Sequence, residues 1–209
     1  MARILITSGP TRQYLDPVRY LTNGSSGRMG QALAEAALAL GHETVIISGP
    51  VVVDYPSEAE VISIVSTEDL LDVARRLFPT CDGVIAAAAP CDYRPQRVEL
   101  QKIAKTGAPI TIQLIETPDV IATLGQQRRD DQWMVGFALE TEDQRFRALA
   151  KLERKSCDFM VLNGPEAMEA IENSVEIIAP NGDVVAALQG TKRDVATAIL
   201  QVIQERLLR

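Results

Sequence analysis

The sequence predicts an α/β protein with a Rossmann-like, mostly parallel sheet, helices on both faces and a C-terminal β-hairpin. Two features predict this fold. Apolar, β-branched runs of strand length alternate with segments of helical period, which is the pattern of a parallel sheet covered by helices. Near the C-terminus, two further runs flank Asn181-Gly182, a dipeptide favoured in tight hairpin turns. The 209 residues contain no repeat, low-complexity tract or linker, so residues 1–209 are predicted to form a single domain.

The strands are predicted from short runs rich in apolar and β-branched residues. They cover residues 3–8, 44–48, 61–65, 83–88, 110–115, 133–138 and 159–162, and the hairpin covers residues 175–188. Long loops separate some of them. Residues 89–109 contain three prolines and a basic pair, a stretch too long for a routine connector, and loops of this kind are often functional.

The helices are predicted from apolar spacing together with capping residues. They cover residues 27–40, 140–156 and 193–208, with a further helix running from a Thr67 cap toward Phe78. Another helix is expected to open with Thr117 as its cap and Pro118 as its first residue.

The charge balance and the N-terminus exclude several classes of function. The formal net charge of −7 argues against broad nucleic-acid binding, which needs a basic surface. The first apolar run is far shorter than the ~20 residues of a membrane span and precedes no cleavage site. We therefore expect neither nucleic acid nor a membrane as partner, and a cytoplasmic location. Cys81, Cys91 and Cys157 are odd in number and widely spaced, so they are predicted to be buried free thiols.

Two stretches after the first strand have the composition of a phosphate-binding loop. Ser8-Gly-Pro-Thr-Arg12 follows the strand, and Thr22-Asn-Gly-Ser-Ser-Gly-Arg-Met-Gly30 precedes the first helix. Glycines allow close backbone approach, and amide N–H groups at a helix start favour anions. The serine hydroxyls and the two arginines would add donors and charge. From spacing alone, a phosphate site and a purely structural glycine loop remain equally good interpretations.

A nicotinamide-dependent reductase is the first alternative on this fold. Against it, the glycines lie some fifteen residues after the strand, and Ser48-Gly49-Pro50 stands where a ribose-binding acid is expected. No tyrosine is followed four residues later by the lysine that such a reductase would need. A non-catalytic nucleotide-binding protein is the second alternative.

Many segments together resemble one family, the phosphopantothenoylcysteine synthetases, and the resemblance covers essentially the whole chain. The matching segments are Thr7-Ser-Gly-Pro-Thr-Arg12, Asp16-Pro-Val-Arg19, Asn23-Gly-Ser-Ser-Gly-Arg-Met-Gly30, Ser48-Gly-Pro50, Ala86-Ala-Ala-Ala-Pro-Cys-Asp-Tyr-Arg-Pro95, Lys102-Ile-Ala-Lys105, Glu116-Thr-Pro-Asp119, Val135-Gly-Phe-Ala-Leu-Glu-Thr141, Lys151-Leu152, Lys155 with Asp158, and residues 173–177.

The resemblance implies a ligase that joins 4′-phosphopantothenate to L-cysteine through an acyl-nucleotide, in coenzyme A biosynthesis. It implies CTP or ATP as co-substrate and Mg²⁺ as cofactor, with metal ligands that the sequence does not identify. No flavin is expected on this chain, and the flavin-dependent decarboxylase fused in many relatives would be a separate partner or absent. It also implies a homodimer that uses residues 133–135 or the final hairpin.

The resemblance assigns the catalytic roles to Asn23 and Lys102. Lys102 lies in a mobile-flap motif and would neutralise the triphosphate, with Lys105 as a second contact; Ala104 replaces a family lysine between them. Asn23 would contact the acyl-nucleotide during its turnover, with Arg19 assisting at the substrate.

The remaining implied contacts are to the nucleotide. Lys151 and Lys155 lie four residues apart, so they share one helix face. Gly164 replaces a family aspartate, so no role passes to it. The implied nucleotide-binding residues are Ser8, Gly9, Pro10, Thr11, Ser25, Ser26, Gly27, Met29, Ala87, Ala88, Asp92, Lys102, Lys105, Phe137, Lys151, Lys155 and Asn163.

Overall fold

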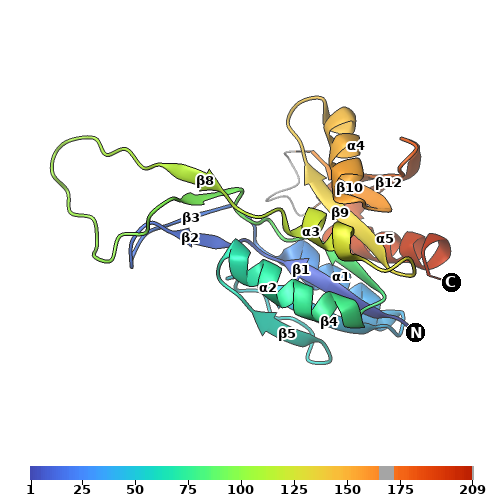
Figure 1. The fold of residues 1–209 in the computed structure, drawn as a ribbon. Helices are drawn as coiled ribbons and strands as arrows, with labels where there is room; N and C mark the ends of the chain where they lie inside the picture. Colours follow the sequence, from blue (N-terminus) through green and yellow to red (C-terminus); the bar gives the residue numbers. More distant parts are fainter. Residues whose placement is uncertain (165–171, 209) are drawn as a thin grey trace.

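The computed structural model describes residues 1–164 and 172–208, and its centre is an eight-stranded sheet (Figure 1). The strand order is β12-β11-β10-β9-β6-β1-β4-β5, with parallel pairing from β10 to β5 and antiparallel pairing of β10, β11 and β12. The strands are β1 (Arg3–Ser8), β4 (Glu43–Ser48), β5 (Glu60–Ser63), β6 (Gly83–Ala86), β9 (Trp133–Leu139), β10 (Phe159–Asn163), β11 (Glu172–Ile178) and β12 (Val184–Thr191).

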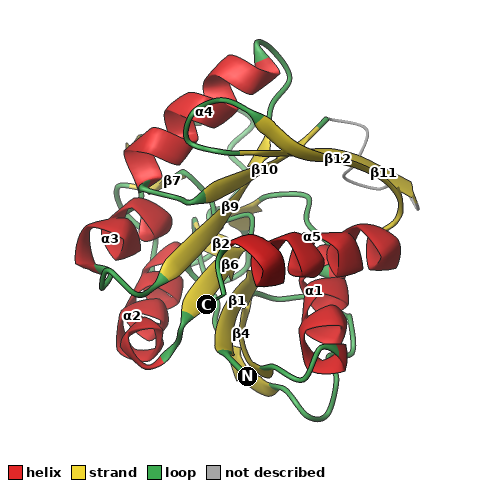
Figure 2. Cartoon of the chain, turned by 90° about the vertical axis from the view of Figure 1, so that its right-hand side faces the viewer, coloured by secondary structure: helices red, strands yellow, loops and turns green. Residues whose placement is uncertain are grey.

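Helices cover both faces of this sheet (Figure 2). On one face lie α1 (Arg28–Ala39) and α5 (Lys192–Arg206). On the other lie α2 (Thr67–Leu77), followed by a short 3₁₀ turn (Phe78–Thr80), α3 (Val120–Gln127) and α4 (Gln144–Lys155). The predicted fold class, including the C-terminal hairpin with its turn at residues 181–182, is confirmed.

The central strands are buried on both faces, which explains why they read as continuous apolar runs. Ile4 and Ile6 of β1 pack into the core under α1 and α5, while Leu5 between them packs into the core under α2, α3 and α4. All three side chains are 0% exposed. The prediction for the cysteines is also confirmed, since Cys81, Cys91 and Cys157 are free and buried.

A second structural unit, which we call the arm, projects from the body (Figure 1). It consists of two short antiparallel pairs, β2 (Arg12–Tyr14) with β3 (Tyr20–Thr22) and β7 (Tyr93–Pro95) with β8 (Leu114–Glu116). Its tip is formed by residues 15–19 and 96–113. The sequence predicts long loops in both places but misses β2, β3 and β7, because three-residue strands carry too little periodicity.

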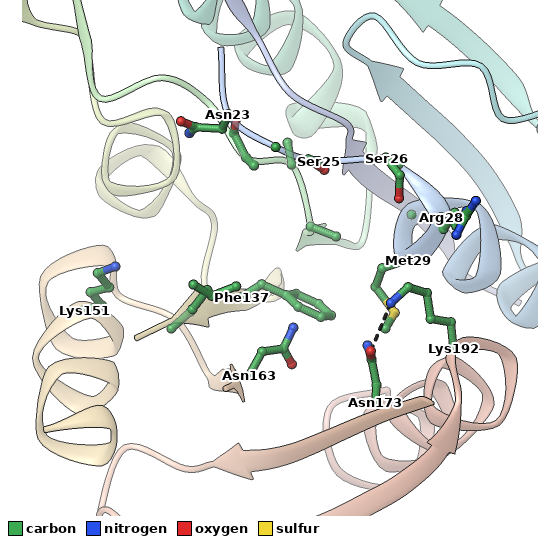
Figure 3. Close-up of a pocket in the computed structure, with 18 residues that line it drawn as sticks. Asn23, Ser25, Ser26, Arg28, Met29, Phe137, Lys151, Asn163, Asn173 and Lys192 are labelled. Atoms are coloured by element: carbon green, nitrogen blue, oxygen red, sulfur yellow. Dashed lines mark hydrogen bonds between the residues drawn. The ribbon is translucent and has the colours of Figure 1, made fainter. Parts of the chain in front are cut away.

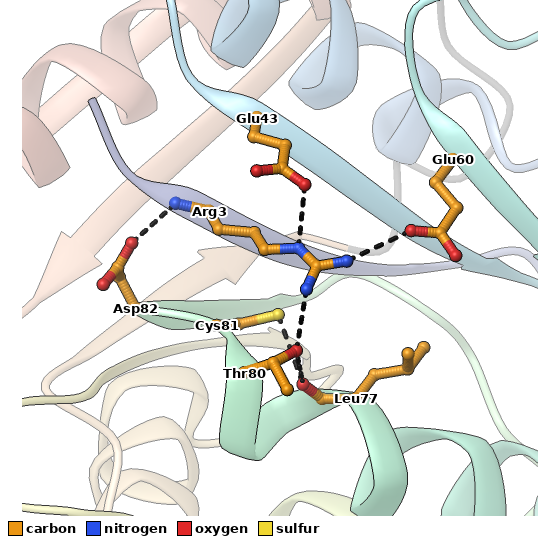
Figure 4. Close-up of polar contacts among 7 residues, drawn as sticks. All are labelled: Arg3, Glu43, Glu60, Leu77, Thr80, Cys81 and Asp82. Carbon is orange, nitrogen blue, oxygen red and sulfur yellow. Dashed lines mark hydrogen bonds and ion pairs between the residues drawn. The ribbon is translucent and has the colours of Figure 1, made fainter.

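A polar cluster around Arg3 lies at the amino ends of the parallel strands (Figure 4). Its guanidinium lies 2.9 Å from Glu43 Oε1 and 3.1 Å from Glu60 Oε2, and it donates to Thr80 Oγ1 at 2.9 Å. The backbone N–H of Arg3 donates to Asp82 Oδ2 at 2.6 Å. These contacts tie β1, β4, β5 and the 3₁₀ turn after α2 together at this edge.

Several predicted boundaries are wrong for local reasons. Ser66, not Thr67, caps α2, because its hydroxyl accepts from Asp69 N while the Asp69 carboxylate accepts from Ser66 N. Asp119, rather than Thr117, caps α3 by accepting from the N–H of Ala122. Four ranges also shift: 61–65 becomes Glu60–Ser63, 83–88 ends at Ala86, 110–115 pairs only as Leu114–Glu116, and 140–156 begins at Gln144.

The strand suggested as a dimer contact, residues 133–135, lies inside the sheet. It belongs to β9, which pairs with β6 on one side and β10 on the other. Its three side chains are at most 4% exposed. Residues 133–135 are thus unable to form an interface, whereas β12 of the final hairpin is an edge strand.

Candidate functional site

A pocket of about 440 Å³, which we call the central pocket, opens where β6, β9 and β10 end at their carboxyl edge (Figure 3). Ligands of open α/β sheets bind at this edge. The lining comes from the loop before α1, the loop after β6, the ends of β9 and β10, and parts of α4, β11 and α5. It consists of residues 23–30, 87–89 and 137–139 with Lys151, Asn163, Asn173 and Lys192.

The loop before α1 is shaped by two glycines. Gly27 occupies the N-cap position with a φ of 76°, a left-handed conformation that favours glycine. At Gly30, a Cβ atom would lie 2.1 Å from Ser8 Oγ, so the helix packs directly on β1. Gly27 has no side chain to cap the first-turn amides of α1, and Ser25 and Ser26 line the pocket beside them. This end of the helix suits an anionic ligand group.

Asn23 joins two walls of the central pocket. Its Nδ2 donates to the carbonyl oxygens of Ala89 at 3.3 Å and Pro90 at 2.9 Å. The loop after β6, which contains Ala87 and Ala88, is thereby tied to the loop before α1. Asn23 therefore lines the pocket and also connects its two walls. The resemblance gave no indication of this second, structural role.

Phe137 of β9 and Asn163 of β10 lie in the middle of the pocket (Figure 3). The Oδ1 atom of Asn163 is buried and accepts no hydrogen bond within the described part of the chain. A buried acceptor without a partner is costly. A ligand donor near Asn163 would remove that cost, while the Phe137 ring offers an apolar face.

Two further predicted contacts lie on α4 as expected, but each has a protein partner. Lys151 reaches the central pocket, and its Nζ is 2.6 Å from Oε1 of the buried Glu140. Lys155 lines an adjoining cavity of about 520 Å³ together with Asp92. Its Nζ is 2.9 Å from Oδ1 of Asp119. Burial alone would raise the pKa of Asp119, but the hydrogen bond and charge of Lys155 bring that pKa below its usual range.

The flap lysines are not in the central pocket. Lys102 and Lys105 are exposed on the tip of the arm, and Lys102 lines a separate cavity of about 590 Å³ there. Arg19 lies at the same tip. The buried Asp16 carboxylate accepts from the N–H of Arg19 at 2.8 Å, from its Nη1 at 3.0 Å and from the N–H of Ile103 at 3.1 Å. Arg19 and Lys102 are thus held together, away from the chain's own pocket.

The predicted contacts Ser8 to Thr11 lie behind the pocket and support its walls. The Ser8 hydroxyl donates to the carbonyl of Gly27 at 3.3 Å. The carbonyl of Gly9 accepts from Ala89 N at 2.9 Å, and Pro10 forms a parallel bridge with Ala89. Thr11 Oγ1 accepts from Cys91 N at 2.8 Å. None of these four residues lines the central pocket.

Among the polar residues of the pocket, sequence reasoning assigned no role to Asn173 and Lys192. Asn173 lies on β11 and is 3% exposed, and its Oδ1 accepts from Lys192 Nζ at 2.9 Å. Residue 173 begins one of the matching segments, which was the available signal. Lys192 follows the capping residue Thr191 and looks like an ordinary first residue of a helix.

The part of the chain that the structure describes contains neither a metal-binding cluster of side chains nor a membrane-spanning helix. No three His, Cys, Asp or Glu side chains gather within residues 1–164 and 172–208 in a way that could hold a metal ion. None of the helices described there combines the length and the apolar character that crossing a bilayer requires.

Comparison with known proteins identifies relatives of the whole chain. Residues 1–207 match the model of the DNA/pantothenate metabolism flavoprotein C-terminal domain. The chain is 36% identical over 207 residues to the coenzyme A biosynthesis bifunctional protein CoaBC of Vibrio vulnificus, covering 96% of this chain and 51% of that protein. Identity to the same protein of Bacillus subtilis is 39% over 205 residues, covering 96% and 50%.

A solved structure is also similar to this chain over nearly its whole length. The crystal structure of the C-terminal domain of the bifunctional protein CoaBC matches with a TM-score of 0.84 and 37% identity, covering 98% of this chain and 95% of that one. The chain spans about half the length of the curated relatives it matches.

Proposed function

The chain belongs to the DNA/pantothenate metabolism flavoprotein C-terminal domain family, and on that premise we propose that it is a phosphopantothenate–cysteine ligase. The relatives bear the name of coenzyme A biosynthesis, and the matched half is their C-terminal domain. One observation carries the proposal: Asn23, the open start of α1, Phe137 and Asn163 face a single pocket at the carboxyl edge of the sheet.

In the proposed reaction, the carboxylate of 4′-phosphopantothenate attacks the α-phosphorus of CTP or ATP. A carboxyl oxygen–phosphorus bond forms, the bond to the β-phosphate oxygen breaks, and pyrophosphate leaves. The cysteine amine then attacks the acyl carbon, loses a proton and releases the nucleoside monophosphate. The first step brings several anionic groups together, so the protein contributes mainly by positioning and by aimed positive charge.

The pocket residues divide these tasks between them. The first-turn amides of α1 and the hydroxyls of Ser25 and Ser26 bind phosphate oxygens. Phe137 packs against the base, and Asn163 Oδ1 accepts a hydrogen bond from the nucleotide. These contacts suit CTP and ATP equally, so they set no preference between the two bases.

Asn23 stands where the loop before α1 meets the loop after β6. Through its bonds to the carbonyls of Ala89 and Pro90 it keeps the pocket open at a fixed width. Its carboxamide oxygen is suited to accept a hydrogen bond from the incoming cysteine amine. Loss of Asn23 therefore affects the second step more than the first.

Mg²⁺ enters this scheme with the triphosphate. The described residues offer no cluster of acidic side chains for it. Mg²⁺ commonly keeps several waters and binds through substrate phosphates, and it supplies neutralisation of phosphate charge. The chain's own residues then need only hold the phosphates.

Lys102 and Arg19 reach a pocket through a second copy of the chain. They lie on the arm tip, and the arm points away from the body that contains the central pocket (Figure 1). The tip, residues 15–19 and 96–113, lies beyond the short pairs β2–β3 and β7–β8, which hold it at a distance from the body (Figure 1). In a two-fold dimer, each arm would instead lie against the partner and bring its lysine to the partner's pocket.

The surface of the arm supports this pairing. Exposed apolar side chains on a projecting element mark protein contacts. On the arm they recur along both strand pairs and the tip. They are Tyr14, Val18, Tyr20, Tyr93, Val98, Leu100, Ile110, Ile112 and Leu114, each between 37% and 87% exposed.

The ligase proposal is tested by incubating the protein with 4′-phosphopantothenate, Mg²⁺ and either CTP or ATP, without cysteine. Mass spectrometry should detect the acyl-nucleotide with one or both triphosphates, and added cysteine should convert it to phosphopantothenoylcysteine. Absence of the acyl-nucleotide with both would refute the proposal. A parallel assay for NAD(P)H oxidation covers the reductase alternative, and binding without turnover would indicate a non-catalytic nucleotide-binding protein.

A further inference from the structure

One end of the central pocket carries two cations from opposite ends of the chain (Figure 3). Arg28 is the first residue of α1, and Lys192 is the first residue of α5. Both residues line the pocket, on the side away from Lys151. The antiparallel addition of β11 and β12 to the sheet brings the start of α5 to this position.

The Lys192 ammonium is held in a defined direction. Its Nζ donates to Asn173 Oδ1 at 2.9 Å, and Asn173 is 3% exposed on β11. A buried amide of this kind fixes the head group of a long, otherwise flexible side chain. The start of α5 is already satisfied by a capping box between Thr191 and Asp194, so the lysine side chain, not the helix amides, faces the pocket.

The electrostatics at this end of the pocket favour an anion. Burial, and then the charge of Arg28, lower the pKa of Lys192, which indicates that the two cations act on each other. The first turn of α1 contains no acidic residue, and its amides lack a side-chain cap. In the described part of the chain Arg28 pairs with no carboxylate. Positive charge therefore gathers here on three separate groups.

On the basis of the ligase function proposed above, we propose that Lys192 is a substrate-binding residue that, together with Arg28 and the α1 amides, holds a phosphate group at this end of the central pocket. Two substrates carry such a group: the triphosphate of CTP or ATP, and the 4′-phosphate of phosphopantothenate. Both present the same chemistry, a phosphate dianion or a diphosphate. Asn173 is the positioning residue for Lys192.

The test compares Lys192→Gln with wild type in calorimetric binding of CTP, ATP, inorganic pyrophosphate and 4′-phosphopantothenate to the full chain. Removing one charge-assisted hydrogen bond between protein and ligand weakens binding by about 10- to 100-fold. We expect that decrease for the triphosphates and pyrophosphate if Lys192 binds the nucleotide, or for phosphopantothenate if it binds that substrate. Lys192→Arg should recover part of the affinity.

The controls separate a direct contact from a structural effect. Arg193→Gln changes the neighbouring residue, whose side chain is 78% exposed and points to Glu35, and should leave every affinity unchanged. Arg28→Gln should weaken the same ligand as Lys192→Gln. The salt dependence of that ligand's binding should also become shallower in both variants, which a mere packing defect would not cause.

The outcomes also separate this inference from the ligase proposal. Affinities of Lys192→Gln within about twofold of wild type for all four ligands would overturn the role of Lys192, even if wild type forms the acyl-nucleotide. In the converse case, wild type forms no acyl-nucleotide while its pyrophosphate affinity still falls in Lys192→Gln. That result would support the phosphate site but refute the proposed ligase activity.

Discussion

Mixing two inactive variants should restore activity if the arm of one copy serves the pocket of the other. Asn23→Ala damages the pocket and leaves the arm intact, whereas Lys102→Ala damages the arm tip and leaves the pocket intact. Each heterodimer then contains one site with both residues intact and one site with neither. Random reassociation of equal amounts gives about half heterodimers, so we expect about a quarter of wild-type activity.

The assay is formation of phosphopantothenoylcysteine by the two variants alone and after co-refolding or co-expression. The matched control is a mixture of Lys102→Ala with Arg19→Ala. Both changes lie on the arm tip, so every site in their heterodimers lacks one residue and no recovery is expected. A mixture of the Asn23 and Lys102 variants that stays as inactive as its components would refute an arm exchanged between copies.

Three further predictions concern the supports of the site. Gly30→Ala would place a Cβ 2.1 Å from Ser8 Oγ, and we expect the free energy of unfolding to fall by about 1–3 kcal/mol in urea denaturation; an unchanged midpoint would contradict the close packing. Burial raises the pKa of Cys157 from 9.0 to about 12. The unfolded thiol therefore loses its proton first, and relative to Cys157→Ala the free energy of unfolding should fall by roughly 1.4 kcal/mol per pH unit between those values; parallel pH profiles would show that the thiol does not titrate as described. Asp16→Ala removes the acceptor that holds Arg19, so acyl-nucleotide formation should slow by roughly 10²-fold while calorimetric affinity for the triphosphate stays unchanged; a weakened affinity would contradict this and show that the arm tip contributes to triphosphate binding itself.

The central sheet could be predicted from sequence because burial on both faces requires apolar residues at consecutive positions. Ile4, Leu5 and Ile6 are all apolar for that reason, although they face two different cores. The first residue of each helix was harder to predict from sequence. Whether Ser66 or Thr67 caps α2 depends on which hydroxyl reaches the backbone of residue 69, and both are acceptable capping residues.

Apart from the strand expected at residues 110–115, part of which forms β8, the strands of the arm escaped prediction, because they are stabilised by partners and not by their own pattern. β2 and β3 pair across a short turn, but β7 and β8 pair across residues 96–113. Three-residue strands are too short to give a periodic signal. The resemblance singled out Arg19 and Lys102 in separate segments, and only the structure shows that Asp16 holds these segments together.

The site was predictable in part. The loop around Asn23, together with Phe137, Lys151 and Asn163, lines one pocket, as the motifs indicated. Ser8 was expected to contact the nucleotide, but it lies behind that loop because β1 ends beneath the start of α1. Lys192 was missed because only the strand order of the final hairpin brings α5 beside α1.

Rapid-quench measurement of the acyl-nucleotide with all three substrates present tests most directly whether the central pocket performs both steps. We expect wild type to form the acyl-nucleotide and discharge it, Lys102→Ala to form it slowly, and Asn23→Ala to accumulate it because cysteine transfer is impaired. Ser25→Ala removes a proposed phosphate contact but leaves the contacts of Asn23 to Ala89 and Pro90 in place, so it should slow formation of the acyl-nucleotide without letting it accumulate. Equal single-turnover rates in wild type and in the Asn23 and Lys102 variants would contradict the assignment of the reaction to this pocket.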